Sequence, residues 1–535
     1  MDREKNYKKK AKNELRNLFK TKKEIALSII ALVSISILLS SIAFSFILPK
    51  PQMSPYGAIT QDSVTKEPAS YIVFQDGSTY YARNGRTGEV KYSGGDIANL
   101  TSYVFNELAP RTWLERVNFK GSFTVSNTIQ IPSYTFLDLS EAKFTANGLE
   151  APMFYSVGSN IEVYGGLIQG NGPQKGTLLY GFFFNGSSNI KISQTKIVST
   201  TWETIYFLNC RNITLISTCH HDSGREGIAV WNDDEHAYEN IDLKVIGSTF
   251  TDCTWDGIVI DSNNVRGVKI ESCTFSNNGY CGIKLNSARE TQIVNCQSVN
   301  NTQHGIYVQN PYKVSTFSRY IGVSRNIIIS DCITGYNGES NIHIKDTDSA
   351  IVEGCTSKYS NMHGIWVENC NFTIVKANVV LNNGQAAPSY WHGIYLTGTE
   401  NSIFSNNVCT DDQQKKTQGV GIYEEAIACD YNTFDDNYCL GNYFSNGLKI
   451  NGVHSTVHHN QGFCTQNSGM VTINNGISAA VNHGLAGTPT SVIVTPRSNI
   501  NGDFWVSYVS STSFVIVVNN PQTVSFYWYA VYDPA

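Results

Sequence analysis

One short pattern recurs along this chain from about residue 181 to residue 450. Each copy begins with a glycine or a small polar residue, followed by an apolar residue, any residue, and a second apolar residue. The copies stand about 23 to 36 residues apart, which is the period of a solenoid with loops inserted in some turns. Charged residues make up 16% of the chain, and the repeats are rich in β-branched residues, so the pattern predicts an all-β solenoid. The repeat positions are Gly181, Thr204, Gly227, Gly257, Gly282, Gly305, Asn341, Gly364, Gly393, Gly421 and Gly447.

The first seventy residues differ from the rest in composition. Residues 1–24 carry ten Lys or Arg against four acids, and residues 25–48 contain no charge. An uncharged stretch of this length can cross a bilayer as a helix, and basic residues before it favour a cytoplasmic N-terminus. We therefore expect a basic cytoplasmic tail, a transmembrane signal-anchor at 25–48, a proline-containing linker at 49–70 and an extracellular bulk. A cleaved signal peptide is the alternative.

The net charge of −5 for the whole chain leaves the outer part mildly acidic. A nucleic-acid partner is therefore not expected. Asp76-Gly77 and Asn84-Gly85 predict turns of an entry hairpin. Asp96 is a suitable N-cap for a short helix at 97–108, which would cover the open first coil. The predicted domains are an N-cap with solenoid at 71–465 and a small β domain, sandwich-like, at 471–535.

Four cysteines stand nine residues before successive repeat positions, at Cys273, Cys296, Cys332 and Cys355. Stacked coils lie about 4.8 Å apart, so these side chains should form an internal ladder. That spacing would permit disulfides, but buried thiols are favoured because free cysteine packs well as a small apolar residue. The chain has no Cys-x-x-Cys motif, so no zinc or iron–sulfur site is expected.

Three phrases of the repeat carry a family resemblance: Asp256-Gly257-Ile258-Val259-Ile260, His304-Gly305-Ile306-Tyr307-Val308 and His363-Gly364-Ile365-Trp366-Val367. Through them the chain resembles the right-handed parallel β-helix proteins of the pectin lyase-like superfamily. The resemblance implies this fold over roughly 110–465. It leaves the activity open, since the superfamily contains polysaccharide lyases, glycoside hydrolases, alginate epimerases, viral tailspikes and noncatalytic surface proteins. The segment from His483 to Tyr529 resembles small β modules of viral fibre and spike proteins.

The motifs of the catalytic branches are incomplete in this chain. The Asp-Asp pairs lack the companion motifs of polygalacturonase-type hydrolases. His221-Asp222-Ser223-Gly224 resembles the second element of the alginate epimerase signature, but the coil before it lacks the first element. An enzyme of the lyase, hydrolase or epimerase type therefore stays an open alternative.

An outward row lies two residues after each repeat position. It contains aromatic residues in consecutive coils, with a lysine before them. Sugar rings stack on aromatic faces, so the row predicts a carbohydrate-binding strip. The alternative is that a loop, a glycan or another subunit covers it. The predicted binding residues are Lys284, Tyr307, Trp366, Tyr395 and Tyr423.

The densest charged cluster of the outer chain surrounds residues 220–236. Glu226 and Asp256 precede the repeat glycine in adjacent coils, and a carboxyl pair is what glycoside hydrolysis needs. We expect these two as the catalytic pair, His221 as proton shuttle and Arg225 as binder of substrate charge. The alternative is a hydrated, salt-bridged loop. The same acids could hold Ca²⁺, although the spacing is a poor calcium signal.

His304, His363 and His392 occupy the same position as these acids in later coils. A repeat-consensus turn position explains them better than a metal site does. The sequence thus predicts a membrane-anchored surface protein that binds a polysaccharide or glycoconjugate, with cleavage or modification left open. The alternative is a noncatalytic adhesin or spike-like protein whose terminal module binds a partner or forms a homotrimer. A viral attachment protein is a third possibility, which a membrane anchor disfavours.

Overall fold

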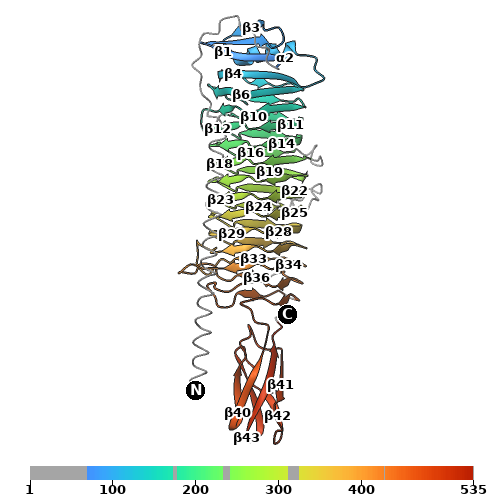
Figure 1. Ribbon diagram of the computed structural model, residues 1–535, viewed down its shortest axis with the longest axis vertical. Helices are drawn as coiled ribbons and strands as arrows, with labels where there is room; N and C mark the ends of the chain where they lie inside the picture. Colours follow the sequence, from blue (N-terminus) through green and yellow to red (C-terminus); the bar gives the residue numbers. More distant parts are fainter. Residues whose placement is uncertain are drawn as a thin grey trace, which may run out of the picture. The chain divides into compact units, whose positions relative to one another are not determined.

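The computed structural model describes residues 69–172, 178–232, 241–310, 324–426, 428–452 and 454–533. Contacts divide the chain into two compact units, Met1–Thr65 and Lys66–Ala535, and the described residues all belong to the second. Within it the chain forms a right-handed parallel β-solenoid followed by a small antiparallel sheet (Figure 1). The predicted fold class is confirmed to that extent.

The predicted localisation needs correction. Across the described part of the chain, no helix is both long enough and apolar enough to cross a bilayer. A single-pass membrane protein is therefore not supported. The segments on which that prediction was based, the tail at 1–24, the anchor at 25–48 and all but the end of the linker at 49–70, lie outside the described residues.

The solenoid begins with a three-stranded antiparallel meander of β1 (Tyr71–Asp76), β2 (Thr79–Asn84) and β3 (Val90–Gly94). Strand β1 also pairs in parallel with β4 (Glu115–Val125), which joins the meander to the first coil. The predicted helix is present as α2 (Ile97–Glu107), and the Asp96 carboxylate accepts the Asn99 N–H at 2.9 Å as its N-cap. Leu100 and Val104 of α2 enter the solenoid core, so the helix closes this end.

Each coil contributes strands to three faces of the solenoid, and the strands stacked on each face pair in parallel. The first face contains the repeat strands, and their register pairs the apolar residues after each repeat position in one unbroken row from Phe182 to Leu448. The row predicted from the sequence is therefore confirmed. Its strands are β5 (Ile129–Gln130), β7 (Phe154–Ser156), β10 (Phe182–Asn185), β13 (Ile205–Leu208), β16 (Ile228–Trp231), β19 (Ile258–Arg266), β22 (Ile283–Val294), β24 (Ile306–Gln309), β27 (Ile342–Lys345), β30 (Ile365–Glu368), β33 (Ile394–Thr397), β36 (Ile422–Glu424) and β38 (Leu448–Ile450).

The second face follows the first along every coil. Strands β19 and β22 are long enough to turn the corner between the two faces. The other strands of this face are β4, β6 (Thr135–Ala146), β8 (Ile161–Tyr164), β11 (Ser188–Ser193), β14 (Arg211–Ile216), β17 (Leu243–Ile246), β20 (Lys269–Glu271), β25 (Ser324–Ser330), β28 (Thr347–Glu353), β31 (Ile374–Lys376), β34 (Ile403–Ser405), β37 (Thr433–Asp435) and β39 (Thr456–His458).

The third face has short strands. Many turn residues between the faces adopt left-handed backbone angles, such as Asn160, Asn189 and Asn212, and asparagine tolerates that conformation better than most residues. The strands of the third face are β9 (Leu167–Gln169), β12 (Lys196–Val198), β15 (Cys219–His221), β18 (Thr249–Thr251), β21 (Thr274–Ser276), β23 (Gln297–Val299), β26 (Ile333–Gly335), β29 (Thr356–Lys358), β32 (Val379–Leu381) and β35 (Val408–Thr410).

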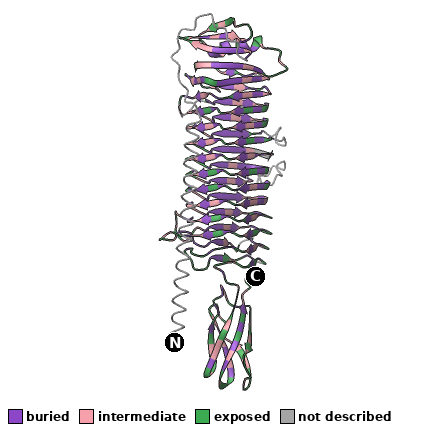
Figure 2. Ribbon diagram, in the orientation of Figure 1, coloured by how far each residue is buried: buried purple, intermediate pink, exposed green. Residues whose placement is uncertain are grey.

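The core runs along the inside of the coils (Figure 2). Alternate residues of each strand point inward, so Ile258 and Ile260 are fully buried, and the rings of Phe250 and Phe275 stack at 4.8 Å between centroids. The predicted cysteine ladder is also internal. All thirteen cysteines of the chain are free thiols, and twelve of them are buried or half-buried.

The terminal sheet has four antiparallel strands. The long strand β43 (Ser513–Val531) pairs with β40 (Gln466–Asn482) along one edge and with β41 (Ser491–Pro496) and β42 (Phe504–Ser507) along the other. Phe514, Phe526 and Trp528 lie in its own core. The sequence led us to expect a sandwich-like domain, whereas these strands form a single sheet through β43.

Candidate functional site

A cleft of about 450 Å³ lies over the outer side of strands β13, β16, β19 and β22 on the first face. It combines acidic side chains with tryptophan and tyrosine rings. Its lining residues are Tyr180, Trp202, Glu203, Tyr206, Arg225, Glu226, Ala229, Val230, Trp231, Trp255, Asp256, Val259, Asp261, Tyr280, Lys284, Asn286 and Gln303. Three of the predicted site residues of the charged cluster, Arg225, Glu226 and Asp256, are among them, as is Lys284.

Register explains why three acids meet in this cleft. Glu203, Glu226 and Asp256 each stand two residues before the first residue of β13, β16 and β19, respectively. Because these strands pair residue for residue, the three acids occupy equivalent positions in three consecutive coils. A stacked coil therefore turns acids that are 23 and 30 residues apart in sequence into close neighbours.

Arg225 is held between two tryptophans. Its guanidinium carbon lies 4.4 Å from the ring centroid of Trp202 and 4.2 Å from that of Trp255. All three residues stand three positions before their strands, so the coils above and below supply the two rings. A guanidinium between two indole faces gains cation–π attraction on both sides.

The same guanidinium contacts two of the acids. Arg225 Nη1 lies 3.2 Å from Glu203 Oε1, and Arg225 Nε lies 3.4 Å from Glu226 Oε2. Glu203 and Glu226 are both buried, and within the described residues their Oε2 atoms have no hydrogen-bond partner. Burial, together with the negative charge of Glu203, raises the pKa of Glu226 to about 8, and burial also raises the pKa of Glu203. Because the two acids are buried next to each other, the pair holds a proton at neutral pH.

Asp256 has a different environment from the glutamate pair. Its Oδ1 accepts the N–H of Cys281 at 2.7 Å. Burial raises the pKa of Asp256 to about 6, while the nearby Lys284 charge opposes that rise. Glu226 and Asp256 thus differ in their protonation at neutral pH, because one is mostly protonated and the other mostly ionised.

His221 does not line this cleft. It lies on β15 of the third face, where its Nδ1 is 3.1 Å from Asp252 Oδ2 and 3.0 Å from Thr251 Oγ1. The acids at 233–235 of the predicted charged cluster lie outside the described residues, so the calcium prediction for them stays untested. Across the described chain, the one group with metal-ligand spacing is Asp435, Asp436 and His459, which lie at the ends of β37 and β39 in adjacent coils and are half-buried or exposed.

The predicted aromatic strip continues the cleft along the first face. Lys284 of the cleft pairs in register with Tyr307, and the row then runs through His343, Trp366, Tyr395 and Tyr423. The side chains of Tyr307, Trp366, Tyr395 and Tyr423 are each half-buried.

Buried histidines pack between the rings of this strip, His343 from the row itself and His363 from the turn before its strand. His343 stacks on Trp366 at 4.1 Å and His363 on Tyr395 at 4.2 Å. Burial lowers the pKa of His343 to about 4 and holds that of His363 well below its usual value, so both are neutral near pH 7. His304 and His392 belong to the same packing. The strip is thus a packed row of rings, of which part remains exposed.

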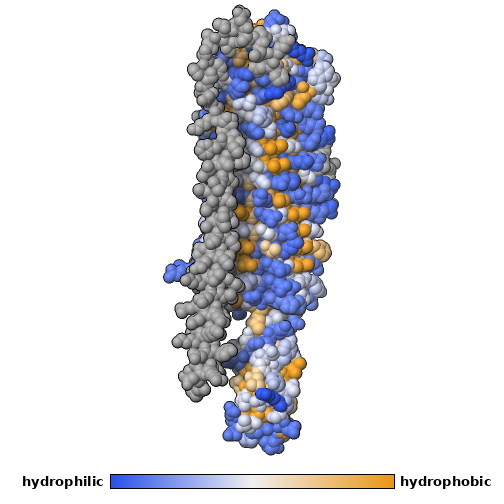
Figure 3. Space-filling view, viewed as in Figure 1, coloured by the Kyte–Doolittle hydropathy of each residue, from blue (hydrophilic) through white to orange (hydrophobic). Residues whose placement is uncertain are grey.

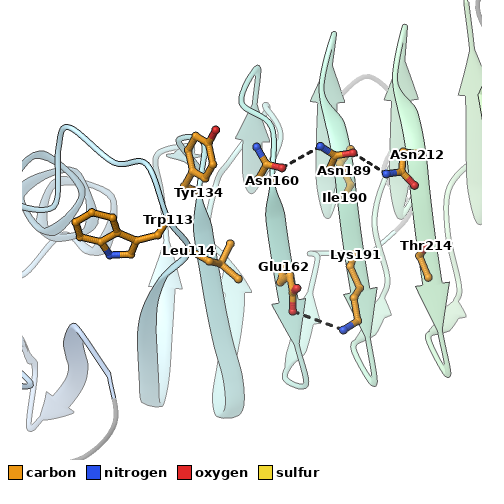
Figure 4. Close-up of a pocket in the computed structure, with 10 residues that line it drawn as sticks. All are labelled: Trp113, Leu114, Tyr134, Asn160, Glu162, Asn189, Ile190, Lys191, Asn212 and Thr214. Atoms are coloured by element: carbon orange, nitrogen blue, oxygen red, sulfur yellow. Dashed lines mark hydrogen bonds and ion pairs between the residues drawn. The ribbon is translucent and has the colours of Figure 1, made fainter.

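A second pocket of about 430 Å³ lies on the second face near the first coils (Figure 4). Asn160, Asn189 and Asn212 form a row of side chains. Asn189 Nδ2 donates to Asn160 Oδ1 at 2.9 Å, and Asn212 Nδ2 donates to Asn189 Oδ1 at 2.6 Å. Below this row Lys191 pairs with Glu162 at 3.6 Å. Trp113, which is 62% exposed, stands at the end of the pocket nearest the first coil. Since its acid, Glu162, is only half-buried and is paired with a lysine, this pocket lacks the buried carboxyl groups of the cleft.

Sequence reasoning did not select Glu203, Trp202 or Trp255 for the site. The signal was present, because reading the positions two and three residues before each repeat strand places them beside Glu226 and Arg225. Outside the cleft, the visible face of the solenoid alternates short apolar rows with hydrophilic ones (Figure 3). The cleft differs from such a surface in its buried charge.

Comparison with known proteins shows that the chain matches one protein family and resembles solved structures of low sequence identity. The sequence profile described as "Right handed beta helix region" matches residues 180–321 and 320–478. No curated protein matches the chain in sequence. Among solved structures, the tailspike receptor binding domain of siphovirus 9NA is 12% identical, covers 80% of this chain and 85% of its own, and has a TM-score of 0.51.

Two further solved structures are similar to part of this chain. The receptor-binding protein of bacteriophage Det7, a podoviral tailspike in a myovirus, is 10% identical, with 64% of this chain and 72% of that chain covered and a TM-score of 0.51. The A-module of the mannuronan C-5 epimerase AlgE6 of Azotobacter vinelandii is 15% identical, with 68% and 93% covered and a TM-score of 0.45. At these identities the likeness is one of fold.

Proposed function

The chain belongs to the right-handed β-helix family, and on that premise we propose that it binds a polysaccharide and cleaves it in the cleft over β13, β16, β19 and β22. One observation carries this proposal. The cleft places Glu226 and Asp256, two buried acids in adjacent coils, beside exposed aromatic rings. Aromatic faces hold the apolar side of sugar rings, and a carboxyl pair with unequal protonation supplies an acid and a base.

The proposed roles follow from the two environments. Glu226, whose pKa burial raises to about 8, keeps its proton at neutral pH and donates it to the glycosidic oxygen. Asp256, whose pKa is about 6, is mostly ionised and acts as base or nucleophile. Arg225 holds the acid in place, and the negative charge of Glu203, together with burial, favours its proton. His221 has no part in this scheme, since it lies on β15 outside the cleft.

The aromatic strip extends the proposed binding site. Tyr307 follows Lys284 directly in the ladder, and Trp366, Tyr395 and Tyr423 continue the same row. A polysaccharide chain lying along the solenoid axis would pass from the cleft onto these rings. The strip therefore supplies further sugar contacts beyond the cleavage site.

The experiment measures new reducing or unsaturated ends when the protein is incubated with a panel of polysaccharides. Glu226→Gln and Asp256→Asn should each lower the rate on a cleaved polymer by about a hundredfold or more, because each removes one member of the acid–base pair. Glu162→Gln, at a half-buried acid on the second face outside the cleft, is the matched control and should leave the rate unchanged. Full activity in both cleft variants would contradict the proposal.

A second candidate function is a noncatalytic adhesin whose terminal sheet binds a partner. The observation that favours it is the outer side of that sheet, where Met470, Ile493, Tyr527 and Tyr529 are all exposed on three adjoining strands. Exposed apolar clusters of this kind mark interaction surfaces. Polymer binding without any product would favour this candidate.

A further inference from the structure

We propose that the cleft takes an uncharged glycan and discriminates against uronate polymers, an inference that rests on the proposed function. From the sequence we expected Arg225 to bind a charge on the substrate, which would be an acidic sugar. The contacts around Arg225 lead to the opposite substrate class.

The contacts of Arg225 are largely made within the protein. Arg225 already contacts Glu203 at 3.2 Å and Glu226 at 3.4 Å, and both of its faces are covered by Trp202 and Trp255. Its Nη1 and Nε already face these acids, so a substrate carboxylate at this guanidinium would compete with two buried acids, and an acid that it displaced would stay buried without its partner. Arg225 is therefore a positioning residue that holds the two acids.

The lining of the cleft carries more acidic than basic groups. Its lining has four carboxyl groups, Glu203, Glu226, Asp256 and Asp261, against two cations, Arg225 and Lys284. With one proton held by the glutamate pair, the acids still outnumber the cations. Lys284 is the second cation, and its charge already acts on Asp256. A uronate carboxylate in this cleft would meet net negative charge, which lowers its affinity.

Exposed aromatic rings and neutral amides are the groups of the cleft that remain for a ligand. Trp231 is 51% exposed, and Trp255 and Tyr280 are each more than a third exposed. Asn286 and Gln303 add amide groups to the lining. Apolar ring faces and neutral amides suit the C–H faces and hydroxyl groups of an uncharged sugar.

The experiment compares retention of the full-length protein on immobilised polysaccharides. The panel holds polygalacturonate and alginate, each beside its carboxyl-reduced form, together with neutral glucans, mannans and galactans. We expect the retained polymers to be neutral, with uronates retained at least about tenfold less. Raising the salt concentration from about 0.05 M to about 0.5 M should change neutral retention less than twofold, because screening affects charge pairs and not ring stacking.

Two variants test the assigned cause. Replacing two acids together, Glu226→Gln with Asp256→Asn, should raise uronate retention, because it removes the repulsion. Lys244→Met on the second face, outside the cleft, is the matched control and should leave the retention of every polymer unchanged. The inference is overturned if uronates are retained preferentially and Lys284→Met or high salt abolishes that retention, a result that leaves the proposed function standing. Retention of no polymer at all would remove both.

Discussion

Single residues of the cleft acquire their properties from their neighbours in the coils above and below. Glu226 is an ordinary glutamate in sequence, yet Glu203 one coil away and burial between them raise its pKa to about 8. In the next coil, burial raises the pKa of Asp256 at the same position to about 6, and Lys284 and the backbone N–H of Cys281 oppose that rise. The difference between two acids thus reflects which coil each one occupies.

At this scale the raised pKa of Glu226 predicts a pH dependence of stability. The folded protein holds a proton that the unfolded chain releases above pH 4.5, so the free energy of unfolding should fall as pH rises from 4.5 to about 8. The melting temperature should therefore be a few degrees lower at about pH 8.5 than at about pH 5. Calorimetry of Glu226→Gln should show a shallower slope, whereas Glu162→Gln should match the natural protein. An identical slope in Glu226→Gln would contradict the assignment.

At the scale of the repeat strand, the glycine serves close approach and not a turn. A Cβ added to Gly257 would lie 2.6 Å from the Gly282 carbonyl oxygen and 2.8 Å from the Phe275 ring, so adjoining coils leave no room for it. Two coils use larger residues at this position. Thr204 places its hydroxyl 2.5 Å from His220 Nδ1, and Asn341 donates to Ser357 Oγ at 3.0 Å, so both satisfy their polar groups inside the coil.

This close packing predicts the effect of Gly257→Ala. The added methyl group must push against backbone of the next coil, so the substitution should lower the free energy of unfolding by about 1–3 kcal/mol. Gly95→Ala is the matched control, because a Cβ there has no neighbour within 4 Å, and it should change stability by less than about 0.5 kcal/mol. Chemical denaturation of both variants measures the difference. Equal stability of the two variants would show that the coils can separate without cost.

At the scale of the whole molecule, the repeat predicted the solenoid because a regular period fixes which residues stack. The same register brought Glu226 and Asp256 together as expected. It did not place His221, because the sequence does not show where β15 ends, and this residue belongs to that strand of the third face and not to the turn that carries Glu226. Trp202 and Trp255 were missed because different residue types occupy their position in other coils. The terminal sheet was less predictable still, since the pairing of β43 with three strands depends on contacts distant in sequence.

The exposed side of the terminal sheet gives a prediction for the assembled protein. If copies of the chain associate through Met470, Ile493, Tyr527 and Tyr529, introducing charge with Ile493→Glu and Tyr527→Glu should reduce an oligomer to a monomer. Light scattering of the full-length protein measures the mass. Lys244→Glu on the solenoid should leave it unchanged. The natural protein behaving as a monomer would remove self-association through this sheet.

The most direct measurement is a crystal structure of the Glu226→Gln protein with an oligosaccharide from a polymer that the natural protein retains. The proposed function predicts a sugar unit in the cleft, with its glycosidic oxygen within hydrogen-bond distance of residue 226 and a ring face against Trp255 or Trp231. An oligosaccharide bound only at the pocket beside Trp113, or on the terminal sheet, with the cleft empty, would contradict it.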